Sequence, residues 1–173
     1  MKVYDGSQTD GTQDSEPERV KVGIAEYRTT TDSAVLTTSG LGSCIGVGIH
    51  DELSGAAGLV HVMLPTADEV EGGNRAKFAD TGVAELVEAL EEAGASRETM
   101  RAKIAGGSDM LDFSENGSSI GSRNVEQVRE TLAEYDIPIV GEDVGGDHGR
   151  SLRLESATGD LVVKSANTES TTL

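Results

Sequence analysis

Cysteine and aromatic residues are scarce in this sequence of 173 residues, which has one cysteine, no tryptophan and 3% aromatic residues. A single cysteine forms no internal disulfide bond, and such usage favours an intracellular protein. No apolar run approaches the ~20 residues of a membrane-spanning helix. Residues 1–19 also lack the apolar core of a secretory signal. We therefore predict a cytoplasmic protein that does not insert into membranes.

Positive charge is scarce as well. The chain has 14 lysine and arginine residues against 31 aspartate and glutamate residues, and its net charge is −17. Nucleic acid and anionic membrane surfaces repel such a protein, so we exclude both as partners. This acidity, with few lysines and few aromatic residues, is typical of salt-adapted (halophilic) proteins that work in a high-salt cytoplasm.

The single cysteine, Cys44, follows a glycine-rich turn and precedes an alternating, strand-like run over residues 45–49. A second strand-like run, residues 58–65, contains His61. Most lone cysteines are small buried hydrophobic residues, and most lone histidines are structural. The glycines around Cys44 suit a packed strand poorly, however, and a histidine is available nearby. We therefore interpret the pair as a catalytic nucleophile and its base.

The spacing of the two runs predicts their pairing. Residues 51–54 form a polar break typical of a hairpin. If His50 pairs with Gly55, Cys44 lies opposite His61, and their Cβ atoms are roughly 4.5–5.5 Å apart. A thiol and an imidazole at that separation can share a hydrogen bond. A neighbouring imidazolium would then lower the pKa of the thiol, as a nucleophilic thiolate requires.

The same pairing sorts the side chains between two faces of the hairpin. Cys44, Gly46, Gly48 and His61 share one face, and the isoleucines and valines between them share the other. The apolar face is the predicted core. We expect the glycine face to leave open space that a substrate side chain fills.

Other polar residues near these runs are candidates for the same site. Thr38 precedes the glycine-rich turn and can hydrogen-bond His61, the third role in a nucleophile–base–orienter arrangement, although alone it is an ordinary strand residue. The three histidines have no carboxylate or thiol at ligand spacing, so we predict no metal site.

Hydrophobic patterning indicates one domain of the α+β class. Residues 1–19 are predicted to be a disordered acidic tail, residues 20–165 a single domain, and residues 166–173 a flexible C-terminal tail. Amphipathic helices are expected over residues 78–93 and 123–134. About eight strands are expected, at residues 20–25, 34–38, 45–49, 58–64, 101–105, 137–140, 151–155 and 161–164. The predicted architecture is a mixed or antiparallel β-sandwich with helices packed on one side.

Six motifs, in order, resemble those of the CheD family of chemoreceptor glutamine deamidases, and the resemblance covers residues 20–164. They are Leu41-Gly42-Ser43-Cys44, Gly58-Leu59-Val60-His61-Val62-Met63-Leu64-Pro65, Lys77-Phe78-Ala79-Asp80, Lys103-Ile104-Ala105-Gly106-Gly107, Ile120-Gly121-Ser122-Arg123-Asn124-Val125, and Glu142-Asp143-Val144-Gly145-Gly146 to Gly149-Arg150. Together they are far more specific than any one of them alone.

The resemblance implies a cytoplasmic hydrolase that converts selected glutamines of methyl-accepting chemotaxis receptors into glutamates. It implies Cys44 as nucleophile, His61 as base and Thr38 as the third catalytic residue, with no cofactor. It also implies a partner, a CheC-like phosphatase of the chemotaxis response regulator.

The chemistry of the residues agrees with this implication. Thiolate attack on the amide gives a thioester that water hydrolyses, and backbone amides near Ser43 and Gly42 can receive the oxyanion. The Gly106–Gly107 turn is a second place where amides can approach substrate. Because an acidic protein gains little from steering toward an acidic receptor helix, we expect recognition by shape and backbone contacts.

Two other interpretations stay open at this point. The domain can be a regulatory binding module that docks a CheC-like phosphatase or a receptor with little catalysis. It can also be a protease or a transglutaminase-like acyl transferase, which uses the same nucleophile on another substrate. A monomer is the default oligomeric state.

Overall fold

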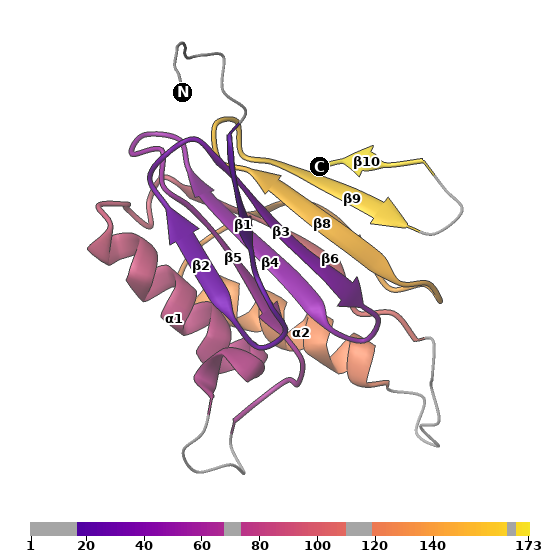
Figure 1. Ribbon diagram of the computed structural model, residues 1–173. Helices are drawn as coiled ribbons and strands as arrows, with labels where there is room; N and C mark the ends of the chain where they lie inside the picture. Colours follow the sequence, from indigo (N-terminus) through magenta and orange to yellow (C-terminus); the bar gives the residue numbers. More distant parts are fainter. Residues whose placement is uncertain (1–16, 68–73, 110–118, 166–168) are drawn as a thin grey trace.

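The computed structural model of the protein describes residues 17–67, 74–109, 119–165 and 169–173 (Figure 1). These residues form two mixed five-stranded sheets. The inner sheet has the order β2 (Tyr27–Thr30), β5 (Ala57–Val62), β4 (Ile45–Asp51), β6 (Met100–Gly106), β7 (Ile139–Val144). The outer sheet has the order β1 (Glu18–Lys21), β3 (Ala34–Leu41), β8 (Arg150–Glu155), β9 (Asp160–Ser165), β10 (Thr171–Thr172). The helices are η1 (Arg75–Lys77), α1 (Ala79–Glu92) and α2 (Ile120–Glu134).

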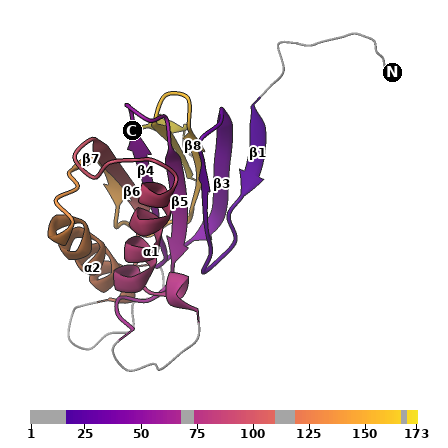
Figure 2. The same ribbon diagram turned by 90° about the vertical axis from the view of Figure 1, so that its left-hand side faces the viewer.

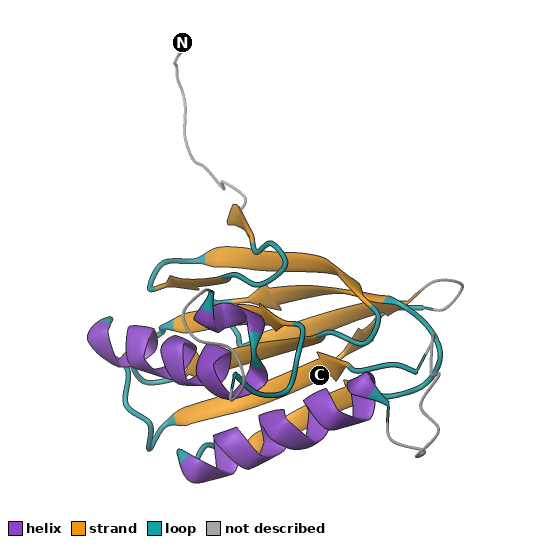
Figure 3. Cartoon of the chain, turned by 90° about the horizontal axis from the view of Figure 1, so that it is seen from below, coloured by secondary structure: helices purple, strands orange, loops and turns teal. Residues whose placement is uncertain are grey.

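The elements stack in three layers, with α1 and α2 on one face of the inner sheet and the outer sheet on its other face (Figure 2). The two helices lie side by side and run roughly along the strands (Figure 3). This arrangement confirms the predicted α+β sandwich with helices on one side. In the described residues, no helix is both long and apolar enough to cross a membrane.

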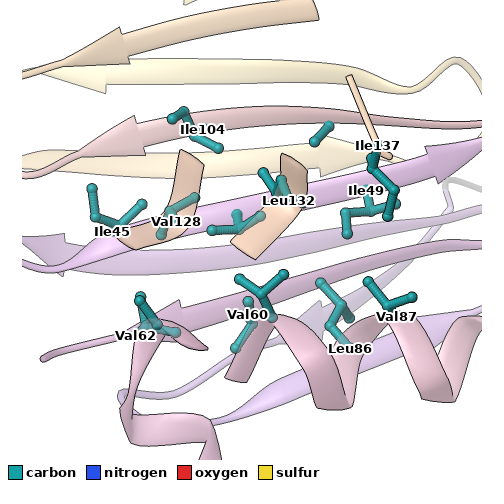
Figure 4. Close-up of a cluster of buried hydrophobic side chains, with 14 of the residues drawn as sticks. Ile45, Ile49, Val60, Val62, Leu86, Val87, Ile104, Val128, Leu132 and Ile137 are labelled. Carbon is teal, nitrogen blue, oxygen red and sulfur yellow. The ribbon is translucent and has the colours of Figure 1, made fainter. Parts of the chain in front are cut away.

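The core between the helices and the inner sheet follows the two hydrophobic periods of the sequence. Alternate residues of β4 and β5 face the helices, as in any strand, and residues three or four apart on each helix face the sheet. The cluster includes Ile45, Ile49, Val60 and Val62 from the sheet and Leu86, Val87, Val128 and Leu132 from the helices (Figure 4). The isoleucines and valines between Cys44 and His61 therefore occupy the core that their pattern predicts.

The glycine face of the hairpin is packed against the outer sheet, which contradicts the prediction of open space there. A Cβ atom added at Gly46 would lie 2.3 Å from Cδ1 of Leu152, and one added at Gly48 would lie 3.4 Å from Cδ1 of Leu154. Both leucines belong to a second apolar cluster between the sheets. The glycines thus let the two sheets approach each other closely and leave no room for substrate above them.

The pairing of β4 with β5 differs by two residues from the predicted pairing. Gly46, not Cys44, lies opposite His61. The difference arises at the turn, where the amide of Asp51 donates to the carbonyl of Ala56 over 2.9 Å. Gly55 then sits inside the turn with φ +79°, a conformation that glycine adopts without strain. A shift of two residues preserves the faces, so Cys44 and His61 still share one side of the sheet.

The strands at the two ends of the chain and at one sheet edge were not all predicted. β2 occupies a segment in which no strand was predicted, and β1 begins two residues before the predicted domain boundary. β10 pairs with β9 through Thr171 and Thr172, within the segment for which no strand was predicted. The rest of the predicted N-terminal tail, residues 1–16, lies outside the described residues.

Candidate functional site

The turn that ends at Cys44 is held by three consecutive hydrogen bonds. The carbonyl groups of residues 42, 43 and 44 accept, in that order, from the Ser108 amide (2.9 Å), the Asn124 side-chain amide (2.8 Å) and the Gly107 amide (2.8 Å). The donors follow β6 or lie in the first turns of α2. The backbone on which the thiol is mounted is therefore fixed by segments that are distant in sequence.

Asn124 connects this turn to the strand that carries His61. Its side chain is fully buried, and Nδ2 also donates to the carbonyl of Met63 over 3.0 Å. Met63 directly follows β5. From the sequence, Asn124 was predicted only as a member of a motif. A buried amide beside an apolar helix face was the one signal that could have singled it out, because buried amides are retained where they make hydrogen bonds.

Gly106 and Gly107 shape the turn that ends at Cys44. A Cβ atom at Gly106 would lie 2.3 Å from the Cys44 carbonyl oxygen, so only glycine permits this approach, and Gly106 also has φ +119°. The Gly107 amide is used by Cys44, and the Gly42 amide donates to Gly40 over 3.2 Å. Gly42 and Gly107, predicted to hold an oxyanion or substrate, thus have their amides occupied.

The Ser43 amide differs from the other predicted oxyanion donors because it is not occupied by another group of the described residues. Within the described residues, this amide has no hydrogen-bond partner. The carbonyl of the same peptide unit, that of Gly42, accepts from the Ser108 amide, so the direction of the Gly42–Ser43 peptide is set from the other side. The amide stays available for an oxygen atom that develops negative charge.

Arg150 supports the same region from the outer sheet. Its side chain is 2% exposed and forms an ion pair with Asp143 of β7, with Nη2 and Oδ1 3.1 Å apart. Nη1 also donates to the carbonyl of Gly106 over 3.4 Å. This buried guanidinium joins β6, β7 and β8 next to the cysteine turn. Sequence analysis had included it only as the end of a motif.

The predicted hydrogen bond between Thr38 and His61 is present. Thr38 Oγ1 and His61 Nδ1 are 2.8 Å apart, and the residues are 5% and 0% exposed. Thr38 lies in β3 and His61 in β5, so the bond spans the space between the two sheets. Nε2 of His61 is buried and has no partner among the described residues. The hydroxyl orients the ring and leaves Nε2 available.

Cys44 and His61 are close in register but not hydrogen-bonded. Cys44 immediately precedes β4, and the shifted pairing places it diagonally to His61. Diagonal neighbours on a sheet lie roughly 7–8 Å apart, less between their Cβ atoms. The Cys44 side chain is half-buried and packs against the apolar cluster between the sheets.

Burial controls the charge of both groups. It raises the pKa of the Cys44 thiol, and a hydrogen bond with the residue's own backbone amide offsets part of that rise. It lowers the pKa of His61. Near neutral pH the pair is therefore an uncharged thiol and an uncharged imidazole. The expectation that a neighbouring imidazolium lowers the pKa of the thiol does not hold in this structure.

Buried polar atoms without partners gather around the cysteine turn. In the part of the chain that the structure describes, they are His61 Nε2, Ser108 Oγ, Asn124 Oδ1 and Arg150 Nε. Each belongs to a residue of this region. Unpaired buried polar atoms are costly, and their concentration here marks a site. The described residues contain no group of three or more histidine, cysteine, aspartate or glutamate side chains able to hold a metal ion.

Comparison with known proteins agrees with the site. A family model described as "CheD chemotactic sensory transduction" matches residues 63–165, and a protein of Haloarcula marismortui named probable chemoreceptor glutamine deamidase CheD is 69% identical over the full length of both chains. The chain belongs to the CheD family. A CheD protein of the same name from Natronomonas pharaonis is 47% identical and covers 90% of this chain and 93% of its own.

More distant CheD relatives match almost as completely. The chemoreceptor glutamine deamidase CheD of Halalkalibacterium halodurans is 41% identical, covering 86% of this chain and 94% of its own. Among solved structures, the hypothetical protein YfiH of Bacillus licheniformis aligns with a TM-score of 0.44 and 15% identity, covering 68% of this chain and 49% of its own. That likeness is too distant to bear on function.

The six motifs are far apart in sequence but come together in the structure. The segments 41–44, 103–107 and 120–125 meet at the cysteine turn, and the segment 142–150 reaches it through Arg150. Lys77 belongs to another motif, and its carbonyl accepts from the amide of Met63 over 2.7 Å. All six motifs therefore build one site.

Proposed function

We propose that this chain deamidates selected glutamine side chains of chemotaxis receptors in the cytoplasm, through a thioester on Cys44. The observation that carries the proposal is the Thr38–His61 hydrogen bond, which leaves His61 Nε2 free on the face of the sheet that Cys44 shares. The names of the CheD relatives supply the substrate class. The acidic composition supports operation in concentrated salt.

In the proposed first step, Cys44 transfers its proton to His61 Nε2, and the thiolate sulfur attacks the side-chain amide carbon of glutamine. The Ser43 amide donates a hydrogen bond to the resulting oxyanion. Thr38 Oγ1 accepts a hydrogen bond from the Nδ1–H group of the imidazolium, which stabilises the charged ring in its buried position.

In the remaining steps, His61 acts first as an acid and then as a base. It returns its proton to the amide nitrogen as the carbon–nitrogen bond breaks, so that ammonia leaves and a thioester remains. Water then attacks the thioester and gives its proton to His61. The carbon–sulfur bond breaks, glutamate is released, and the thiolate regains the proton.

Bound substrate has to bring Sγ of Cys44 and Nε2 of His61 within hydrogen-bond distance. Catalytic hydrogen bonds are often long or absent in unliganded enzymes and tighten when substrate binds. The turn that bears Cys44 is fixed through its carbonyl groups, while the half-buried thiol itself can rotate. A rotamer change at Cys44 is the smallest motion that completes the site.

The test is mass spectrometry of receptor cytoplasmic domains incubated in concentrated salt with wild-type protein, Cys44→Ala and Cys44→Ser. Each glutamine converted to glutamate adds roughly one dalton. We expect the gain with wild type alone, since serine is a much weaker nucleophile than cysteine. Deamidation by Cys44→Ala at the wild-type rate would refute the mechanism. Receptor binding without deamidation by wild type would favour a regulatory binding module instead.

A CheC-like phosphatase is a further proposed partner. Its support is the resemblance of the six motifs to the CheD family, and no surface of this chain is assigned to it. The binding module and the deamidase are compatible, because a partner that covers the cysteine turn would regulate access to Cys44. Measuring deamidation with and without a purified CheC-like protein tests this coupling.

A further inference from the structure

A groove of about 240 Å³ lies on the outer sheet and is lined by residues of β1, β3, β8 and β9 together with Ser170. The helices are on the far side of the molecule from this sheet (Figure 2). Alternation along the strands explains its lining. Val20 and Leu154 belong to the cluster between the sheets, so Lys21 and Arg153 point the other way.

The groove is basic in a protein that is otherwise strongly acidic. Four of its lining residues are Arg19, Lys21, Arg153 and Lys164, from a total of 14 lysines and arginines in the whole chain. Among the residues that the structure describes, no aspartate or glutamate lines it. The local charge of the groove is therefore positive, although the net charge of the protein is −17. Such a groove attracts carboxylates and repels other basic surfaces.

The strand pairing keeps these positive charges together. Lys21 pairs with Thr37, and Thr37 also pairs with Arg153, so both basic residues lie in one row across the sheet. Arg153 has a carboxylate neighbour, Glu155, whose Oε2 is 3.6 Å from its Nε, but both side chains are partly exposed to solvent. Exposed pairs of this kind are worth little, so Arg153 remains able to bind another carboxylate.

The groove also reaches the candidate site. Thr37, Thr38 and Ser39 line it, and Thr38 hydrogen-bonds His61 on the other side of the strand. From Ser39 the chain continues through the turn to Cys44. A segment bound in the groove therefore lies beside the strand that orients the base.

We propose that the groove binds an acidic segment of the receptor substrate, next to the segment that carries the reactive glutamine. The inference rests on the proposed function for the identity of the partner. The chemistry of the reaction supports it, because each turnover leaves a new glutamate carboxylate in the substrate. It adds a local ionic contact to the expected recognition by shape and backbone contacts, even though the whole protein is acidic.

The test compares two double variants with the same change in net charge. Lys21→Glu/Lys164→Glu reverses the groove, and Arg28→Glu/Arg101→Glu makes the matched change on exposed residues of the inner sheet. We expect the groove variant to raise the KM for receptor cytoplasmic domains about tenfold with kcat unchanged, because the reversed charges repel an acidic segment but lie outside the Cys44–His61 pair. The control variant should match wild type. Lys21→Gln/Lys164→Gln should give a smaller rise.

The salt dependence and a binding measurement make the outcomes distinct. The rise in KM should shrink as the salt concentration is increased. The Debye length, over which charges act on each other, falls to ~3 Å at 1 M salt. An unchanged KM in the groove variant, with active wild-type enzyme, would overturn the proposal and leave the deamidase function intact. A KM that falls would mean that the groove holds an inhibitory acidic segment, such as residues 1–16 of this chain, and would equally overturn it.

If wild-type protein does not deamidate receptors, the groove is tested by receptor binding in the Cys44→Ala background. Weaker binding by the groove variant than by its control would support the groove while the deamidase function fails. Equal binding by both would overturn the groove as well. Circular dichroism at each salt concentration verifies that all variants are folded.

Discussion

Removing the side-chain amide of Asn124 should destabilise the protein and disorganise the cysteine turn. Asn124→Ala leaves the carbonyls of Ser43 and Met63 without the donor that each now has at 2.8 and 3.0 Å. An unsatisfied buried polar group costs about 1–3 kcal/mol. The variant also removes Oδ1, which has no partner in the described residues and offsets part of the loss. The expected net cost is about 2–4 kcal/mol.

For a domain of this size each kcal/mol corresponds to about 2–4 °C, so the melting temperature should fall by roughly 4–16 °C. Thermal unfolding by circular dichroism measures this. Gln127→Ala is the matched control, because Gln127 lies in the same helix and donates only to Thr131 Oγ1. Asn124→Asp keeps the shape without the donors and should be at least as unstable as Asn124→Ala. A change within about 0.5 kcal/mol would refute the role assigned to Asn124.

Three further predictions concern the site. Thr38→Val should lower kcat by up to 10²-fold, since the base loses its orienting partner. Thr38→Ser keeps the hydroxyl group and should retain most of the activity, so equal rates for the two variants would contradict the prediction. Gly46→Ala should cost about 1–3 kcal/mol by overpacking against Leu152, and adding Leu152→Ala should cost less than the sum of the two single changes in denaturant unfolding. Because the pKa of Cys44 is raised, its alkylation by iodoacetamide should be slow at neutral pH and accelerate as pH rises through that pKa; fast alkylation at pH 7 would disprove it.

Hydrophobic periodicity was enough to predict the layers of the fold. Both helices and the core strands carry their apolar residues at regular spacing, and each was found within a few residues of its predicted bounds. β2 was missed because its Tyr27–Thr30 sequence has no apolar alternation, and its stability comes from pairing with β5. β10 was missed because Thr171 and Thr172 are exposed and bind through their backbone to β9.

The candidate site was only partly predictable. Faces on a strand repeat every two residues, so a pairing error of two left Cys44 and His61 on the correct side of the sheet. The same error gave a wrong separation between the two residues. The geometry of the turn determines which residues pair, and the number of residues between the strands does not determine it alone. The packing of the outer sheet on Gly46 depends on residues distant in sequence, such as Leu152. No local pattern reveals such contacts.

The uncharged resting state of the pair has a consequence for the proposed reaction. Burial opposes both a thiolate at Cys44 and an imidazolium at His61, so a preformed ion pair is disfavoured without substrate. Proton transfer becomes favourable only when the negative charge moves onto the substrate oxygen and is met by a backbone donor. Thr38 then has a second role, because its hydroxyl oxygen is the acceptor for the Nδ1 proton of the cation. In the proposed reaction deprotonation and attack are thus coupled, and near neutral pH the thiol becomes a strong nucleophile only when a glutamine side chain reaches it.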